Sequence, residues 1–265
     1  MVDDGLYDEK KHNCPIPDVV LGQHVFPMPA GKVSTSAGSV MSAADSYQVT
    51  IHGRGAHGSM PQASIDPVLT ACHIVTRLQG IVSRETPPAE MAVLTVGSVQ
   101  AGESENVIPE EAIIKLDMRT MNEKVRKTMR SAIERIVKAE CQAGGCVKEP
   151  EIVETRQFPL TDNSEEVVKK LDKTMGEYFG ENWDPTFENA LGSEDFSVLA
   201  RAVDKPYCFW FFGGHDPAKL KEWQSGDKDQ TPVNHSAFFC PEIQPTLTTG
   251  TDTLAVAALT YLKKA

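Results

Sequence analysis

Two histidines at opposite ends of the sequence are the residues whose type and setting best suit a metal site. His24 follows an apolar run at residues 19–21 and precedes Pro27 and Pro29, which exclude a helix. We therefore expect His24 at the end of a buried strand, before a stiff loop, and we expect His235 in a similar loop. A single histidine is more often structural than a ligand, but two imidazoles at strand ends could begin a zinc site. Two imidazoles do not complete one.

Residues 192–197, Gly-Ser-Glu-Asp-Phe-Ser, form a second candidate segment. In one interpretation Ser193 caps the helix that follows, with Asp195 or Glu194 in its first turn. In the other, the acidic groups lie beside a cationic cleft and contribute to binding. The sequence leaves both interpretations open.

Three further residues could contact a small molecule. His57 lies in a stretch rich in glycine, residues 51–61, which lets the backbone approach a ligand but also suits an ordinary turn. Asn106 could make a turn or donate a hydrogen bond to a developing oxyanion. Arg119 could be a surface residue or could bind a carboxylate with two parallel hydrogen bonds.

The composition narrows the class of protein. The chain has 265 residues, 40% hydrophobic and 24% charged, with a formal net charge of −11. The acidic balance argues against nucleic acid and anionic membrane surfaces as partners. No segment is typical of a signal peptide or membrane span, so we expect a cytoplasmic protein. The six cysteines are scattered without a CxxC pair, and we expect free thiols rather than a disulfide framework or a nucleophile.

Hydrophobic periodicity predicts an inserted unit over residues 46–156. The expected elements are strands at 39–51, 91–99, 112–118 and 147–155, a helix that opens at Asp66-Pro67, and a helix over 122–143 that ends at Gly144-Gly145. An apolar stripe on the first helix is expected to include Val68, Ala71, Cys72, Val75 and Leu78. The order strand, helix, strand, strand, helix, strand is that of a ferredoxin-like α+β unit, which could make a two-fold dimer through a sheet edge or helix face.

The flanking residues predict an α/β domain interrupted by that unit. Helices are expected at 163–179, 195–202 and 246–264, with a strand covered on both faces at 207–212, a turn at 213–216 and a polar loop at 216–233. Leu247, Thr251, Leu254, Ala258 and Leu262 lie along one side of the last helix.

Taken together, these segments resemble the zinc-dependent amidohydrolases related to hippurate hydrolase, the indole-acetic-acid–amino-acid hydrolases and the aminoacylase-type carboxypeptidases. The resemblance is carried, in order, by Gly22-Gln-His24, Gly53-Arg-Gly-Ala-His57, Asp66-Pro67, Ser83-Arg84, Gly102, Asn106-Val-Ile-Pro109, Arg119-Thr120, Ser193-Glu-Asp-Phe196 and Asn234-His235. It implies a zinc-peptidase-like three-layer catalytic domain at 1–45 and 157–265, with the unit at 46–156 as a lid or dimerisation domain. It also implies cleavage of the amide bond of N-acyl amino acids at a two-metal site and a homodimer formed through the lid.

The resemblance assigns roles to individual residues. His24 and His235 match metal ligands, the metal being divalent and most simply zinc. His57 matches a lid histidine that binds the substrate or its oxyanion across the dimer. Asn106 and Arg119 match lid positions that contact the substrate, and the segment with Ser193 and Glu194 borders its pocket.

The sequence departs from this family in one respect. The resemblance places the family's remaining ligands, in a Cys-Gly-His and a Glu-Glu motif, upstream of His24, and this sequence contains neither. One of those glutamates is the general base, so the chain is expected to lack a catalytic residue, to be truncated at the N-terminus and to be inactive alone. Strand 207–212 would then have unpaired edges. The alternative is a non-catalytic chain that dimerises with a complete relative and regulates it.

Overall fold

The computed structural model describes residues 1–225 and 230–262. It divides into two compact units, each considered by itself. Unit 1 comprises Met1–Met41, Thr161–Ala190 and Asp195–Ala265, and unit 2 comprises Ser42–Leu160 and Leu191–Glu194. The short segment with Ser193 and Glu194 therefore belongs to the same unit as His57, Asn106 and Arg119.

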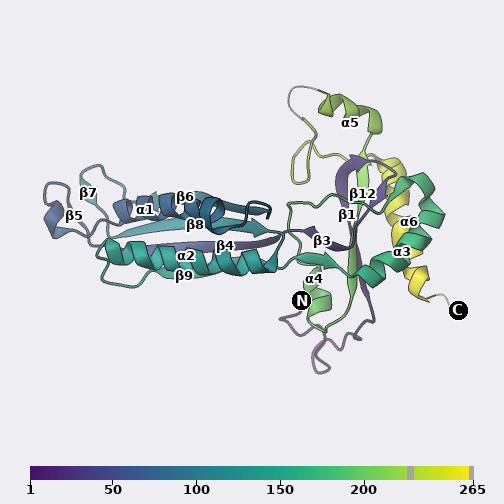
Figure 1. Ribbon diagram of the computed structural model, residues 1–265, viewed down its shortest axis with the longest axis horizontal. Coiled ribbons are helices and arrows are strands. Elements are labelled where there is room, and N and C mark those ends of the chain that lie inside the picture. The colour runs from purple at the N-terminus through teal and green to yellow at the C-terminus, as the bar shows by residue number, and fades with distance from the viewer. Residues whose placement is uncertain (226–229, 263–265) are drawn as a thin grey trace. The chain divides into compact units, whose positions relative to one another are not determined.

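Unit 2 is built on a four-stranded antiparallel sheet. Its strands are β4 (Ala43–His52), β6 (Ala92–Ala101), β8 (Glu111–Thr120) and β9 (Glu151–Phe158), in the spatial order β6-β8-β4-β9. Helices α1 (Pro67–Gly80), continued by a short π-helix η2 (Ile81–Glu85), and α2 (Glu123–Ala143) pack on the sheet (Figure 1). This is the predicted ferredoxin-like order, with β6 and β9 as its two edges.

Local sequence signals set the helix ends of unit 2. The Asp66 carboxylate accepts hydrogen bonds from the main-chain N–H groups of Val68 and Leu69, with Pro67 in the first turn. Asn122 caps α2 in the same way, and α2 ends at Ala143, before the predicted Gly144-Gly145. The apolar stripe predicted for α1 is partly wrong, because Val68 and Cys72 are exposed. The buried face of α1 consists of Pro67, Thr70, Ala71, Ile74 and Leu78.

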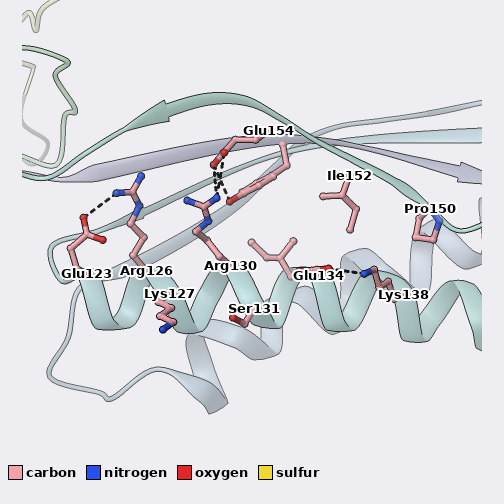
Figure 2. A pocket seen from close by; sticks show the side chains of 12 residues that line it. Glu123, Arg126, Lys127, Arg130, Ser131, Glu134, Lys138, Pro150, Ile152 and Glu154 are labelled. Atoms are coloured by element: carbon pink, nitrogen blue, oxygen red, sulfur yellow. Dashed lines mark hydrogen bonds and ion pairs between the residues drawn. The ribbon is translucent and has the colours of Figure 1, made fainter. Parts of the chain in front are cut away.

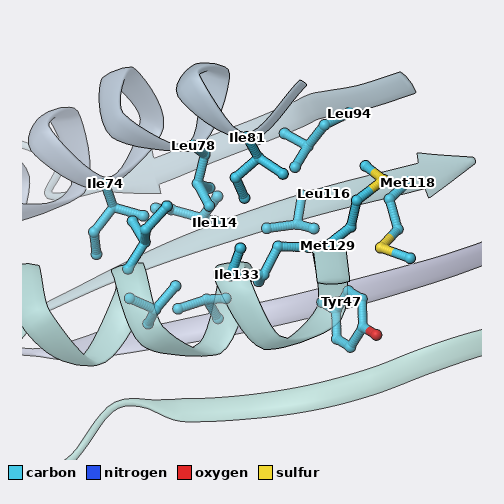
Figure 3. Packing of buried hydrophobic residues seen from close by; sticks show 14 of the residues in the cluster. Tyr47, Ile74, Leu78, Ile81, Leu94, Ile114, Leu116, Met118, Met129 and Ile133 are labelled. Atoms are coloured by element: carbon cyan, nitrogen blue, oxygen red, sulfur yellow. The ribbon is translucent and has the colours of Figure 1, made fainter. Parts of the chain in front are cut away.

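The core of unit 2 lies between the sheet and its helices (Figure 3). Alternate residues of β8 point into it, so that Ile114, Leu116 and Met118 are buried against Ile74 and Leu78 of α1 and against Met129 and Ile133 of α2. Unit 2 therefore has a hydrophobic core of its own.

A small antiparallel ribbon of two strands extends unit 2 beyond the main sheet. Its strands are β5 (Ala56–His57) and β7 (Val107–Ile108), which are far apart in the sequence, and a 3-10 turn η1 (Pro61–Ala63) follows β5. The ribbon pairs His57 with Val107, and it lies next to the end of the sheet where β8 begins (Figure 1).

Unit 1 holds the sheet that carries His24. Strands β1 (Val20–Pro29), β2 (Val33–Ser34), β11 (Trp183–Asp184) and β12 (Tyr207–His215) lie in the order β1-β12-β2-β11, and β1 and β12 are parallel. The prediction that strand 207–212 has unpaired edges is wrong, because β12 pairs with β1 on one side and with β2 on the other. The predicted turn at 213–216 is also wrong, since β12 continues to His215.

Apolar clusters cover both faces of β12, as the continuous run at 207–212 predicts. Cys208 and Trp210 pack with α3 (Glu165–Phe179) and α6 (Ile243–Leu262), whereas Phe209 and Phe211 pack with Phe26 and other aromatic side chains. The remaining elements of unit 1 are β3 (Gly38–Met41), β10 (Thr161–Asn163), η3 (Gly180–Asn182), α4 (Ser197–Arg201) and α5 (Pro217–Gln224).

Two predictions at the C-terminal end need adjustment. The segment 216–233, expected as a polar loop, begins with helix α5, whose first turn is capped by the Asp216 carboxylate. Residues 226–229 of that segment, and residues 263–264 of the last predicted helix, lie outside the described residues. Between residues 1 and 262, leaving out 226–229, no helix is both long and apolar enough to cross a membrane.

Candidate functional site

His24 lies in the middle of β1, opposite Phe211 of β12, rather than at a strand end as predicted. The strand continues through Pro27 and Pro29 because β1 is an edge strand, where a missing N–H costs little. The His24 Nδ1 lies 2.6 Å from the carbonyl oxygen of Val25. A carbonyl only accepts, so Nδ1 carries the hydrogen and Nε2 holds the lone pair, the arrangement typical of a metal-binding histidine.

The segment before His235 is attached to the same point of β1. The Asn234 Nδ2 donates to the Val25 carbonyl oxygen at 3.0 Å, so one carbonyl binds side chains from both histidine segments. His235 has a φ of 68°, an uncommon left-handed conformation for a residue other than glycine. The structure thus brings the segments of the two predicted ligands together within unit 1.

His215 is a residue of this region that the sequence analysis missed. It is buried at the end of β12, and its Nε2 lies 2.7 Å from the carbonyl oxygen of Pro232, three residues before His235. Its ring packs edge-on against Trp223 and Phe239. His215 therefore anchors the chain that leads to His235, and its place at the end of an apolar run was the only sequence signal for it.

The two imidazoles do not make a complete metal site. Within residues 1–225 and 230–262, no group of three or more His, Cys, Asp or Glu side chains is arranged to hold a metal ion. Catalytic zinc sites generally take three protein ligands, and the anionic ones offset the charge of the cation. The donors among the described residues therefore do not suffice to hold the implied metal.

In unit 2 the ribbon of β5 and β7 brings His57 and Asn106 together. The N–H of Gly58 donates to the Asn106 carbonyl oxygen at 2.7 Å, and a Cβ at Gly58 would lie only 3.1 Å from that oxygen. The Ser59 N–H donates to His57 Nδ1 at 3.2 Å, and the Ser59 Oγ lies 2.8 Å from the same nitrogen. Nδ1 is thus the acceptor, and the exposed Nε2 carries a hydrogen that can be donated.

Arg119 and the segment at 191–194 form another group in unit 2. Arg119 donates from its guanidinium to the Leu191 carbonyl oxygen at 2.9 Å and to Asp117 Oδ2 at 3.1 Å. Ser42 Oγ also donates to carbonyl oxygens of this segment. The segment that includes Ser193 and Glu194 is therefore held beside Arg119. The capping interpretation of Ser193 is wrong, because α4 starts only at Ser197 and has no side-chain cap.

The two groups of unit 2 lie at opposite ends of its sheet. Glu111 begins β8 next to the ribbon that carries His57, and Arg119 is close to the other end of that strand (Figure 1). Eight residues of extended chain correspond to about 26 Å. A small acyl amino acid cannot touch His57 and Arg119 of the same unit at once.

A groove between α2 and β9 is lined by charged side chains that pair with one another (Figure 2). At its base the Arg126 guanidinium makes two hydrogen bonds, of 2.6 and 2.8 Å, to the buried Asp45 carboxylate. That contact raises the pKa of Arg126, and burial next to Asp45 raises the pKa of Tyr47. Arg130 pairs with Glu154 at 3.1 Å. These paired charges fix α2 on the sheet, and no local sequence signal predicted them.

The cysteines are free thiols, as predicted. Burial raises the pKa of Cys141 and of Cys208 to about 12, which keeps both thiols protonated near neutral pH. These two buried cysteines are therefore poor nucleophiles.

Comparisons with known proteins give this arrangement a family context. Residues 42–145 match the model of the M20 family's peptidase dimerisation domain. The chain is 33% identical over 211 residues to hippurate hydrolase of Campylobacter jejuni, which covers 79% of this chain and 53% of the hydrolase. The chain thus spans about half the length of the curated relatives it matches.

Solved structures agree in fold. A structure from methicillin-resistant Staphylococcus aureus superposes with a TM-score of 0.80 and 25% identity, over 99% of this chain and 62% of that one. A dinuclear metal binding peptidase of the M20 family from Bacillus subtilis superposes with a TM-score of 0.67 and 22% identity, over 94% of this chain and 58% of its own. The chain belongs to the M20 family of metal-dependent peptidases and amidohydrolases.

Proposed function

We propose that this chain is the lid-bearing part of a metal-dependent amidohydrolase that cleaves the amide bond of N-acyl amino acids. The observation that carries the proposal is the junction at Val25, where the segments of His24 and His235 meet and the His24 Nε2 is left as an acceptor. The remaining anionic ligands and the general-base glutamate belong to a part of the whole protein that this chain does not span.

Each predicted site residue has a chemical role in this proposal. His24 and His235 hold the metal together with ligands from outside the chain. The His57 Nε2–H and the Asn106 amide donate to the oxygen of the scissile carbonyl as negative charge develops on it. Arg119 binds the carboxylate of the amino acid, and Ser193 and Glu194 line that end of the pocket.

The separation of these residues favours a homodimer. Glu111, at the His57 end of the sheet, and Arg119 lie about 26 Å apart along β8, so one substrate takes its oxyanion donor from one chain and its carboxylate contact from the other. Two sheet edges are available for the contact. We place it at β6, where Val93 and Val99 are exposed and which lies within the match to the dimerisation domain, whereas β9 lies outside that match.

The experiment that tests this proposal supplies the part the chain does not span. The chain is produced together with the unmatched part of C. jejuni hippurate hydrolase, and cleavage of N-benzoylglycine is measured. We expect cleavage that is lost with His24→Asn or His235→Asn and retained with His73→Asn, an exposed histidine of α1. Cleavage that survives both of the first two substitutions would refute the assigned roles.

A second candidate function has its own support. Unit 2 has its own core and matches a dimerisation domain, whereas the part of the chain that the structure describes has an incomplete set of metal donors. A chain of this kind could pair with a complete M20 relative and regulate it. Co-purification of the tagged chain with such a relative, and a change in that relative's rate of hydrolysis, would favour this function.

A further inference from the structure

Two of the six cysteines lie together at the end of helix α2. The N–H of Cys146 donates to the carbonyl oxygen of Cys141 at 3.0 Å. Between them, the N–H of Gly145 donates to the carbonyl oxygen of Gln142 at 3.1 Å, and Gly145 has a φ of 73°, in the left-handed region. These features define a Schellman motif, in which the side chains at the two outer positions come into contact. Here both outer positions are cysteines.

The surroundings of the two thiols also place them side by side. Cys141 is 3% exposed and belongs to the core of unit 2, and the half-buried Cys146 packs against the same core. Burial raises the pKa of Cys141 to about 12, and the charge of Cys146 and a hydrogen bond with it add to the rise. One thiol is thus shielded from solvent, whereas its neighbour is open to a small molecule.

The turn between the two cysteines is held in place by helix α1. A Cβ at Gly144 would lie 2.4 Å from Oγ1 of Thr70, a buried residue of α1, so the main chain of the turn packs closely on that helix. Disulfides join residues whose Cα atoms lie about 4.4–6.8 Å apart, which suits two residues whose main chains share a direct hydrogen bond. The two cysteines can therefore be bridged without a large movement of the main chain.

We propose that Cys141 and Cys146 are a redox-sensitive dithiol, which low-molecular-weight disulfides such as oxidised glutathione convert into an intrachain disulfide. The accessible Cys146 sulfur attacks one sulfur of oxidised glutathione, the glutathione S–S bond breaks, and the first glutathione leaves with the proton of Cys146. The Cys141 sulfur then attacks Cys146 Sγ, the mixed disulfide breaks, and the second glutathione leaves with the proton of Cys141. The two cysteines are oxidised, and one glutathione disulfide is reduced to two thiols.

This modification would act on the end of α2. The new bond would close a ring around the Schellman turn and tie the last turn of the helix to the segment that leads to β9. Helix ends open locally at little cost in free energy, and a covalent ring opposes that opening. The inference is independent of the proposed function, because neither cysteine is among the residues assigned to the site.

The test follows the oxidation state of each cysteine in the full chain. The reduced protein is equilibrated with mixtures of reduced and oxidised glutathione, quenched with acid, alkylated and analysed by peptide mass spectrometry. A disulfide between Cys141 and Cys146 removes two hydrogen atoms, whereas a mixed disulfide adds a glutathione. Cys72, an exposed cysteine on α1 of the same unit, is the internal reference. The variants are Cys141→Ala and Cys146→Ser, with Cys72→Ala as control, and circular dichroism establishes that each is folded.

We expect a transient mixed disulfide at Cys146 that is replaced by the intrachain disulfide. Half-oxidation should need about tenfold less oxidised glutathione, or lower still, than half-modification of Cys72, because the second step is intramolecular. In Cys141→Ala the mixed disulfide at Cys146 should persist, and in Cys146→Ser the buried Cys141 should stay reduced. Cys72→Ala should not alter the oxidation of the pair. Amides of residues 142–147 should exchange more slowly in the oxidised protein.

Three results would overturn the inference. They are a mixed disulfide at Cys146 that persists in the original chain, two free thiols under conditions that modify Cys72, and a bridge formed in preference with another cysteine or another chain. Cys146→Ser changes only a half-buried side chain, so a misfolded Cys141→Ala leaves the test decisive. Oxidation of Cys141 by glutathione in Cys146→Ser would show that Cys146 is not the point of entry and would also overturn the inference.

Discussion

The side-chain amide of Asn234 donates a 3.0 Å hydrogen bond to the carbonyl oxygen of Val25, although 209 residues separate the two in sequence. The same oxygen accepts from His24 Nδ1. One main-chain carbonyl of β1 thus orients His24 and fixes the residue beside His235. Such outer contacts of a metal ligand set which ring nitrogen is available to the metal.

Opposite tautomers are predicted for His24 and His57. The Val25 carbonyl requires a hydrogen on Nδ1 of His24, whereas the Ser59 N–H requires a lone pair on Nδ1 of His57. Long-range nitrogen–proton NMR spectra, at a pH where histidine is neutral, should show the Nδ1–H form for His24 and the Nε2–H form for His57. The same tautomer at both positions would contradict their roles as metal ligand and hydrogen-bond donor.

The buried pair of Asp45 and Arg126 should be strongly coupled in stability. Arg126→Met leaves the Asp45 carboxylate buried without its two hydrogen bonds, and we expect a loss of about 3–5 kcal/mol in the free energy of unfolding. The double variant Asp45→Leu/Arg126→Met should recover much of that loss. Urea unfolding measures the original chain, Arg126→Met, Asp45→Leu and the double variant.

The control for this pair is Arg77→Met. Arg77 forms an exposed ion pair with Glu140 and should contribute only about 0–1 kcal/mol. Additive effects of the two substitutions at Asp45 and Arg126 would show that the pair does not act as a unit.

Dimerisation should depend on the β6 edge of unit 2. Val99 of β6 and Val153 of β9 are similarly exposed, at 49% and 52%, and lie on opposite edges of the same sheet. Val99→Lys should convert dimer to monomer in light scattering, because it places a charge in the proposed contact, whereas Val153→Lys should leave the dimer unchanged. A dimer that is lost with Val153→Lys and retained with Val99→Lys would show that the dimer contact is at β9.

Stability should fall in alkaline solution through Cys208. Burial raises the pKa of this thiol from 9.0 to about 12, so the folded state holds its proton more tightly than the unfolded chain does. The resulting stability is fully present below pH 9 and is lost as the pH rises toward 12. We expect the urea midpoint to fall as the pH rises from 9 toward 12, and Cys208→Ala to reduce that fall.

Cys72→Ala is the matched control for this measurement, because Cys72 is exposed. It should leave the pH dependence of the urea midpoint unchanged. A fall of the same size in the Cys208→Ala variant would show that other groups are responsible.

Local signals predicted much of the fold. Asp66-Pro67 and Gly144-Gly145 mark helix boundaries through hydrogen bonds and backbone preferences that involve only a few neighbouring residues. The alternation of β8 predicted a strand because one face of the sheet is buried. These features need no knowledge of the rest of the chain.

Features that depend on distant contacts were not predictable in this way. Pro27 and Pro29 led us to expect that the strand ends at His24. Prolines are tolerated within a strand only if that strand is at the edge of its sheet, and the position of β1 at an edge is a property of the whole sheet. The pairing of Asp45 with Arg126 spans 81 residues. The apolar stripe on α6 was visible in the sequence, but only the structure shows that it faces away from unit 1.

The most direct test of the account is the metal content and activity of the purified chain, alone and together with the unmatched part of C. jejuni hippurate hydrolase. The donors described above are too few to hold a metal, so the chain alone should contain no stoichiometric zinc and should not cleave N-benzoylglycine. The assembled protein should contain zinc and cleave it, and should lose both with His24→Asn. One or two zinc ions per chain with turnover by the chain alone would contradict the account.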